Sequence, residues 1–295
     1  KLLPRNKPGS YRPRLVFKTR MSFDQYPRRP VVTQSENTAY TNYHRLLFNL
    51  GYTQTRFYKA SHIYRFGRTE DVPAGTQMEA TMGHEKSEFA TRFYMGASVV
   101  HAGWAKNIGY AALKVSAGTY LAHGKHQQSS YRIEGQYFTN QIKAGKTRAR
   151  QFVSFHYTRG FDRKADEYLQ INDDYGIRDF YADSLFGSQR CVFRLETVLF
   201  PQWYYYGFGA AIFAYYDGAF LGKNRLFYHN HYYSCIGLGF RIRNENLVFN
   251  SLEIRFGWYP VTVPGVNKYS TYLSNENAPP FPGFSNSLPG VEPYR

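Results

Sequence analysis

Hydrophobic and polar residues alternate with a period of two along most of the chain. Between about residue 41 and residue 260, segments of roughly 10 to 16 residues show this alternation, and clusters of Gly, Asn, Asp or Lys separate them. Because successive side chains of a strand point to opposite faces, this pattern predicts long β-strands. Helical periodicity is not sustained anywhere. We therefore predict an all-β protein whose neighbouring strands run antiparallel.

Charged residues indicate which face of each predicted strand is polar. In residues 188–200, Arg194 and Glu196 share one face, whereas Phe193 and Leu195 share the other. The same division into a charged face and an apolar face recurs in residues 109–121, 148–157 and 247–259. These strands are therefore expected to separate a polar environment from an apolar one.

The pattern divides the chain into three parts. Residues 1–40 are basic and rich in proline, and they form a lead-in with one possible strand near residues 14–23. Residues 41–260 hold the alternating segments. Residues 261–295 contain six of the 14 prolines. Since proline cannot donate to a strand ladder, we expect this last part to be an extended tail without strands.

Strand length and loop length favour a membrane barrel over a soluble β-sandwich, which would also alternate. The segments exceed the roughly 9 to 11 tilted residues that a strand needs to cross a bilayer. Short connections are expected at residues 143–146, 201–202 and 244–246, and long ones at residues 161–187 and 219–228. Tight turns at one rim and loops at the other are typical of transmembrane barrels.

All three tryptophans, Trp104, Trp203 and Trp258, fall at the ends of predicted strands. Tryptophan is enriched where a membrane meets water, so these residues are expected to be interfacial aromatics. The alternative is that they cap the core of a soluble protein. With the strand pattern, they predict a transmembrane antiparallel β-barrel of roughly 12 to 16 strands.

Composition agrees with strands rather than spanning helices. The chain has 28 Tyr and 24 Phe, residues that suit pleated surfaces. The mean hydropathy is -0.54, and no segment approaches the roughly 18 uninterrupted apolar residues that a spanning helix needs. A barrel strand shows lipid only alternate residues, so low hydropathy does not exclude it. No signal peptide is present at Lys1, and we expect the numbering to begin within a mature or truncated chain.

The formal net charge of +16 permits a nucleic-acid surface, a patch facing anionic lipid headgroups, or a lumen lined with Lys and Arg. The basic residues are dispersed over nearly every predicted strand and loop rather than gathered in one stripe. Inward-facing charge and contact with anionic lipopolysaccharide explain this distribution better than nucleic acid does. We therefore predict outer-membrane lipid as a partner and no nucleic-acid partner.

One sequence motif narrows the prediction. The long connection after residue 161 contains the run Gly176, Ile177, Arg178, Asp179, Phe180. The next predicted strand carries Glu196, and the strand after that ends in Tyr216, Asp217, Gly218. The phase of the alternation puts both acidic residues on the polar faces of their strands. A confined arginine opposite two carboxylates can hold a loop in place through charge-assisted hydrogen bonds.

This order of motifs resembles the BamA-type superfamily of outer-membrane assembly and secretion barrels, also called the bacterial surface antigen family. That family has a V/I-R-G-F/Y tip on an extracellular loop that folds back into the lumen, with an acidic residue on the next strand and an F-x-D-x-G on the strand after. The resemblance covers roughly residues 51–260. It implies that Arg178 is the loop-tip arginine and that Glu196 and Asp217 are its partners in the lumen.

The chain departs from the family pattern in three respects. Asp179 stands where the family has glycine. The family barrel has sixteen strands and ends in a strand with a terminal aromatic residue, whereas this chain shows fewer spans and a proline-rich tail. No part of it resembles the periplasmic repeat domains of the family.

Other chemistry is weakly represented. The tripeptide His229, Asn230, His231 is expected where a loop enters a strand, without the further ligands that a metal or nuclease site needs. The pair Glu70, Asp71 is expected to help form a turn rather than an acid-base site. Cys191 and Cys235 are predicted to be free thiols. We therefore predict no catalytic residue, no metal, no cofactor and no enzyme activity.

The sequence thus predicts an outer-membrane barrel that assists outer-membrane protein assembly, secretion or surface export as part of a multi-protein complex. The lead-in and tail resemble segments that interact with other outer-membrane or periplasmic subunits. The alternatives are a passive anion-favouring pore, a soluble β-barrel that binds an apolar ligand, and an outer-membrane lipid enzyme.

Overall fold

The computed structural model describes residues 12–63, 69–172, 175–244, 252–261, 263–275, 284 and 287–294. These residues form one antiparallel sheet and two short 3-10 turns, η1 (Thr38–Tyr40) and η3 (Phe227–His229). The strands are β1 (Arg14–Asp24), β2 (Tyr43–Ser61), β3 (Thr69–Ser87), β4 (Thr91–Ala105), β5 (Gly109–Ala122), β6 (Lys125–Thr139), β7 (Ile142–Ala144), β8 (Thr147–Phe161), β9 (Gln189–Phe200), β10 (Tyr204–Tyr205), β11 (Phe208–Gly222), β12 (His231–Asn244), β13 (Leu252–Trp258) and β14 (Tyr269–Ser274). The all-β, antiparallel prediction is confirmed.

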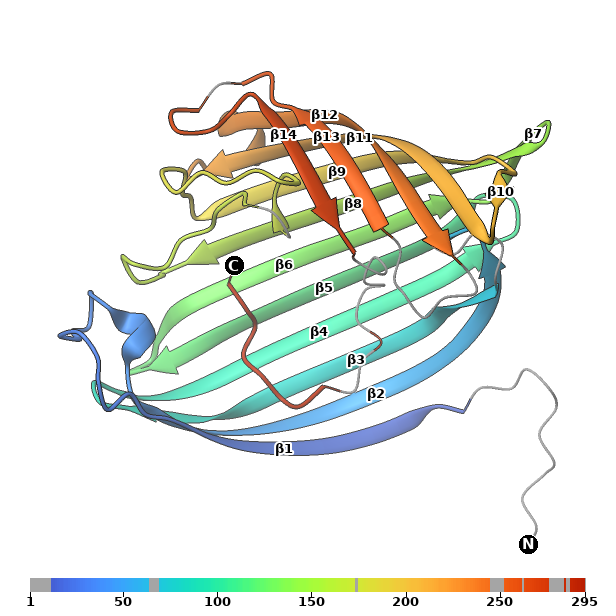
Figure 1. Cartoon of the computed structure of the whole chain (residues 1–295). Coiled ribbons are helices and arrows are strands. Elements are labelled where there is room, and N and C mark those ends of the chain that lie inside the picture. Colours follow the sequence, from blue (N-terminus) through green and yellow to red (C-terminus); the bar gives the residue numbers. More distant parts are fainter. Residues whose placement is uncertain are drawn as a thin grey trace, which may run out of the picture.

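The sheet is a meander in which each long strand pairs with the next one along the chain. Its order is β1-β2-β3-β4-β5-β6-β8-β9-β11-β12-β13-β14, while the short strands β7 and β10 pair only with β8 and β11. Figure 1 shows the sheet curling strongly around an interior. Among the described residues, β1 pairs only with β2 and β14 pairs only with β13, so these two strands form the ends of the described sheet.

The outer face of the sheet, which points away from the interior of the curl, is apolar. Phe17 is 67% exposed, Leu50 56% and Leu238 59%, although each lies within a long strand. Equivalent exposed apolar residues occur on the strands between them, among them Met82, Val99, Val115 and Leu195. Soluble proteins rarely expose a contiguous apolar surface of this extent.

The inner face carries most of the charged residues of the sheet, and several of these charges are paired between strands. Arg45 of β2 bonds to Glu85 of β3 at 2.8 Å, and Lys18 of β1 bonds to Glu79 of β3 at 2.7 Å. The sheet therefore inverts the usual rule that apolar side chains face inward and charges face solvent. No helix in the described parts of the chain is both long enough and apolar enough to cross a membrane.

Three predictions about the elements need correction. Glu70 and Asp71 were expected in a turn, but they lie in β3 and pair with Ala60 and Lys59 of β2. The tail was expected to lack strands, but β14 lies within it and pairs with β13 over six residues. The prolines of the tail flank this stretch on both sides, so Tyr269 to Ser274 keep all their backbone donors. The second long connection was expected from residue 219, but β11 continues to Gly222. The short turn expected at residues 244–246 lies largely outside the described residues, as do residues 1–11 of the lead-in.

Candidate functional site

The longest described connection, residues 162–188 between β8 and β9, folds over the inner face of the sheet. Its two arms are joined by a pair of backbone hydrogen bonds between Leu169 and Gly187, of 2.8 and 3.0 Å. Leu169, Ile177 and Phe180 are buried in one apolar cluster with side chains of β9, β11 and β12. We call this segment the inward loop.

The backbone near the tip of the inward loop is tight. A Cβ atom at Gly176 would lie 1.9 Å from the carbonyl oxygen of Ile171, so only glycine fits there. Asp179 has a φ of 58°, in the left-handed region. Aspartate is one of the few residues other than glycine that tolerate this conformation. Asp179 can therefore adopt this backbone conformation although it is not a glycine.

Arg178, next to that turn, reaches the two carboxylates that the sequence indicated. Its guanidinium forms a bidentate contact with Asp217 of β11, with Nε–Oδ2 at 2.9 Å and Nη2–Oδ1 at 2.7 Å. Its Nη1 donates to Glu196 of β9 at 2.5 Å. The backbone N–H of Arg178 also donates to Asp217, which is completely buried. The structure thus brings Arg178, Glu196 and Asp217 together at the loop tip.

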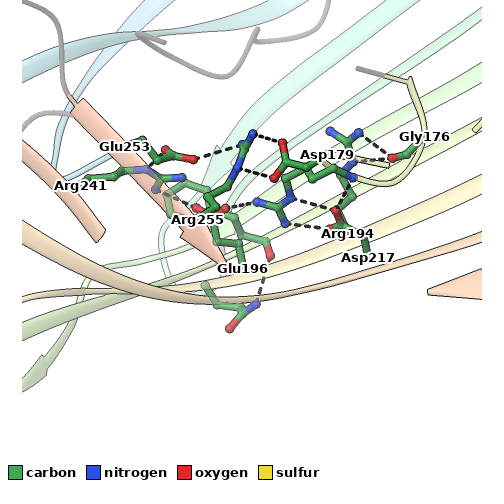
Figure 2. A network of polar contacts seen from close by, with 11 residues as sticks. Gly176, Asp179, Arg194, Glu196, Asp217, Arg241, Glu253 and Arg255 are labelled. Carbon is green, nitrogen blue, oxygen red and sulfur yellow. Dashed lines mark hydrogen bonds and ion pairs between the residues drawn. The ribbon is translucent and has the colours of Figure 1, made fainter. Parts of the chain in front are cut away.

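The contacts continue into a wider network that returns to the same loop (Figure 2). Glu196 also accepts from Arg241 of β12 at 2.8 Å. Arg241 donates to Glu253 of β13 at 2.5 Å, and Glu253 accepts from Arg255 of the same strand at 3.2 Å. Arg255 then donates to Asp179 at 3.0 and 2.6 Å. We call the residues Arg178, Asp179, Glu196, Asp217, Arg241, Glu253 and Arg255 the loop-tip network.

The arginines of the loop-tip network also stack on aromatic rings of the inner face. The guanidinium carbon of Arg178 lies 4.2 Å from the ring centre of Tyr215, and that of Arg241 lies 4.1 Å from the ring centre of Phe213. Such cation–π contacts orient the planar guanidinium as well as stabilising its charge. The hydroxyl of Tyr259 donates to the carbonyl oxygen of Asp179 at 2.8 Å and fixes the loop backbone from another side.

Charge balance explains why these groups remain ionised. Burial alone would lower the pKa of Arg178, but the charges and hydrogen bonds of Asp217 and Glu196 raise that pKa well above its ordinary value. Three arginines face four carboxylates, and each arginine contacts at least one of them. Because every charge has a partner, the network can hold the inward loop in one position despite the cost of burying ions.

The sequence motif did not include three residues of this network, Arg241, Glu253 and Arg255. Asp179 was noted only as a residue that stands where the BamA-type pattern has glycine, yet it pairs with Arg255. The alternation of residues 247–259 already placed Glu253 and Arg255 on the polar face, and this was the available signal. Arg194 was likewise on the polar face, and its Nη2 donates to the carbonyl oxygen of Gly176 at 2.6 Å.

The three tryptophans do not behave alike. Trp203 and Trp258 are 63% and 44% exposed, and they lie at opposite ends of the strands, in the β9–β10 connection and at the end of β13. Trp104 instead packs on Phe138, with ring centres 5.5 Å apart, beside a buried apolar cluster. This corrects the expectation for Trp104, which faces the interior rather than the outer surface.

Comparisons with known proteins add no family assignment. No protein-family model matches the chain, and a search of curated proteins found no match. Interpretation of the site therefore rests on the geometry described above.

Proposed function

We propose that this protein is an integral β-barrel of a bacterial outer membrane. The observation that supports it most is the inverted distribution of side chains, apolar on the outer face and charged on the inner face. In water, exposure of apolar strand residues such as Leu50, Val115 and Leu238 would be costly. In a bilayer the same residues face lipid, and the charged residues line a wet lumen.

Strand length supports the same proposal. The strands from β2 to β6 contain 14 to 19 residues, which is more than the roughly 9 to 11 residues that cross a bilayer at a tilt. An unpaired strand edge in lipid would leave backbone groups without partners. We therefore infer that β1 and β14 pair, directly or through a further segment, when the barrel is in the membrane.

The role that we propose is that of a BamA-like barrel that assists outer-membrane protein assembly, secretion or surface export within a multi-protein complex. The support is the inward loop and the position of Arg178 between Glu196 and Asp217, which is the arrangement that the family resemblance implies. The loop would lie on the extracellular side. The polar inner face gives less support to a soluble barrel that binds an apolar ligand.

Extraction and gel mobility test the membrane proposal. We expect the protein to partition with the outer-membrane fraction, to require detergent for purification, and to migrate faster on gels before heating than after. Recovery of folded protein from the aqueous fraction without detergent would contradict the proposal.

Pull-down of the native protein tests the proposed role separately. We expect other outer-membrane or periplasmic proteins to co-purify with it after mild detergent extraction. A protein that always purifies alone, and that shows large steady anion current in planar bilayers, would instead favour the passive pore.

A further inference from the structure

Residues 287–294 lie inside the curl of the sheet, far from the inward loop in sequence (Figure 1). The segment crosses the inner faces of β1, β4, β5, β6 and β8, and side chains hold it without any strand pairing among its described residues. On β1, Lys18 Nζ donates to the carbonyl oxygen of Ser287 at 3.0 Å. We call residues 287–294 the lumen segment.

The centre of the lumen segment is Glu292. Its carboxylate accepts from Ser116 Oγ of β5 at 2.8 Å and lies 3.5 Å from Arg132 Nε of β6. Its backbone N–H donates to the hydroxyl of Tyr94 of β4 at 2.7 Å. Arg132 also donates to the carbonyl oxygen of Pro293 at 2.5 Å. Side chains from three neighbouring strands therefore recognise one acidic residue and its backbone.

The next contacts are aromatic. The ring of Tyr294 lies under the guanidinium of Arg163, with 4.1 Å between the guanidinium carbon and the ring centre. The same ring lies against Gly160, where a Cβ atom would come within 2.5 Å of it. Gly118 leaves similar room for Glu292, whose Cβ atom would be 2.9 Å from a Cβ added there. The inner face is thus shaped for the carboxylate and the ring of this segment.

The lumen segment does not fill this site completely. A polar cavity of about 180 Å³ remains between the segment and the inner face, lined in part by Lys18, Thr81 and Lys114. In the described part of the chain, the Tyr294 hydroxyl is buried without a hydrogen-bond partner. A segment that is held by side chains and leaves such a group unsatisfied can be released at lower cost than a paired strand.

We propose that the inner face of β1 to β8 is a peptide-binding site and that the lumen segment is its exchangeable resident ligand. The ligand class is an extended peptide with a carboxylate that is followed within two residues by an aromatic ring. Arg132 and Ser116 select the carboxylate, and Arg163 with Gly160 selects the ring. While the lumen segment is bound, it occupies the interior and excludes other peptides of this class.

A variant that ends at residue 286 tests this proposal. The probe is a fluorescent peptide of residues 287–295, and binding is measured by anisotropy in detergent micelles, or in buffer if the protein proves soluble. We expect saturable binding to the shortened variant and at least about tenfold weaker binding to the full chain, whose site is occupied. Peptides with Glu292→Gln or Tyr294→Ala should each bind about tenfold more weakly, which corresponds to the loss of one good contact.

Arg132→Met in the shortened variant should weaken binding of the unmodified peptide by a similar factor. The matched control is Arg159→Met on β8, because Arg159 donates to the carbonyl oxygen of Arg225 rather than to the lumen segment. Equal binding of a scrambled peptide, or no binding to a shortened variant that still unfolds cooperatively on heating, would overturn the proposal. Neither result depends on whether the protein lies in a membrane.

Hydrogen exchange on the full chain covers the case in which the shortened variant does not fold. We expect the amide of Glu292 to exchange more slowly than in the free peptide, and Arg132→Met to remove that protection while the amide of Ile177 in the inward loop stays protected. Exchange of Glu292 at the free-peptide rate in the unmodified chain would refute the site. Protection that Arg132→Met leaves unchanged would refute the assigned contacts.

Discussion

Arg178 is the residue on which the inward loop most depends. It is the only residue of the loop-tip network that contacts both Asp217 and Glu196, and it does so from a loop rather than from the sheet. Glu196 keeps Arg241 if Arg178 is removed, but Asp217 is completely buried and would lose its charged partner. A buried carboxylate without a partner is strongly destabilising.

We therefore predict that Arg178→Ala lowers the free energy of unfolding by about 3 to 5 kcal/mol. Thermal or urea unfolding of the detergent-solubilised protein measures this loss. Asp183→Ala is the matched control, because Asp183 is an exposed residue of the same loop. If both substitutions have the same effect, Arg178 does not hold the loop.

Asp179 combines a backbone conformation that favours glycine with a side chain that forms a buried ion pair. Its left-handed backbone would suit glycine, yet its carboxylate forms a bidentate contact with the buried Arg255. We predict that Asp179→Gly destabilises the protein by about 2 kcal/mol, since losing a buried ion pair outweighs relief of the backbone strain. In an Arg255→Met background the same substitution should be neutral or stabilising, and a double-mutant cycle measures the difference. Additive effects would mean that the pair is not coupled.

At the scale of elements, the conformation of the inward loop depends on the close approach of two of its backbone segments. Arg194 binds the carbonyl oxygen of Gly176, and Gly176 itself lies directly against the backbone of Ile171. A side chain at position 176 would push the backbone around Gly176 away from the backbone of Ile171. The tip residues would then no longer meet β9 and β11 in register.

Gly176→Ala should therefore loosen the inward loop without unfolding the sheet. We expect cleavage within residues 162–188 by a nonspecific protease to become roughly tenfold faster, since an opening cost lower by about 1.4 kcal/mol raises the open population tenfold. Gly103→Ala on β4 is the control, because a Cβ atom there meets nothing within 4 Å. Unchanged cleavage of the loop would show that the contact with Ile171 is not limiting.

The alternation of the sequence was sufficient to predict most of the long strands but not all of their faces. In strands that carry charged residues, such as β9 and β13, the charges show directly which face is polar. In β4 the residues from Gly96 to Ala105 carry no Asp, Glu, Lys or Arg that would mark the polar face. Trp104 was therefore expected to be interfacial from its strand-end position alone, although it shares the inner face with Val100 and Ala102. Strand β14 was missed because its six residues lie between proline-rich stretches.

Contacts between distant segments could be predicted only where a motif named both partners. The run around Arg178 and the positions of Glu196 and Asp217 gave one such set. The pairing of Asp179 with Arg255, 76 residues apart, depends on the path of the loop across the sheet, and no local pattern specifies that path. The same holds for the contacts of Glu292 with β4, β5 and β6.

At the scale of the whole molecule, the two faces of the sheet have opposite requirements. Many charges on the inner face are paired with one another, with the inward loop or with the lumen segment. The outer face has exposed apolar residues on most of the long strands, a distribution that is rare in soluble proteins. A substitution that introduces charge on the outer face therefore distinguishes lipid from water directly.

Leu238→Lys provides that test, because Leu238 lies near the middle of β12 and is 59% exposed. In a bilayer the lysine would lie near the midplane and should cost about 2 to 4 kcal/mol of folding free energy, measured by unfolding in lipid vesicles. Val31→Lys is the control, since Val31 is 82% exposed in the β1–β2 connection and should be insensitive. In a soluble protein both lysines would be tolerated equally, and that result would contradict the membrane proposal while leaving the loop-tip network and the lumen segment to be tested on their own.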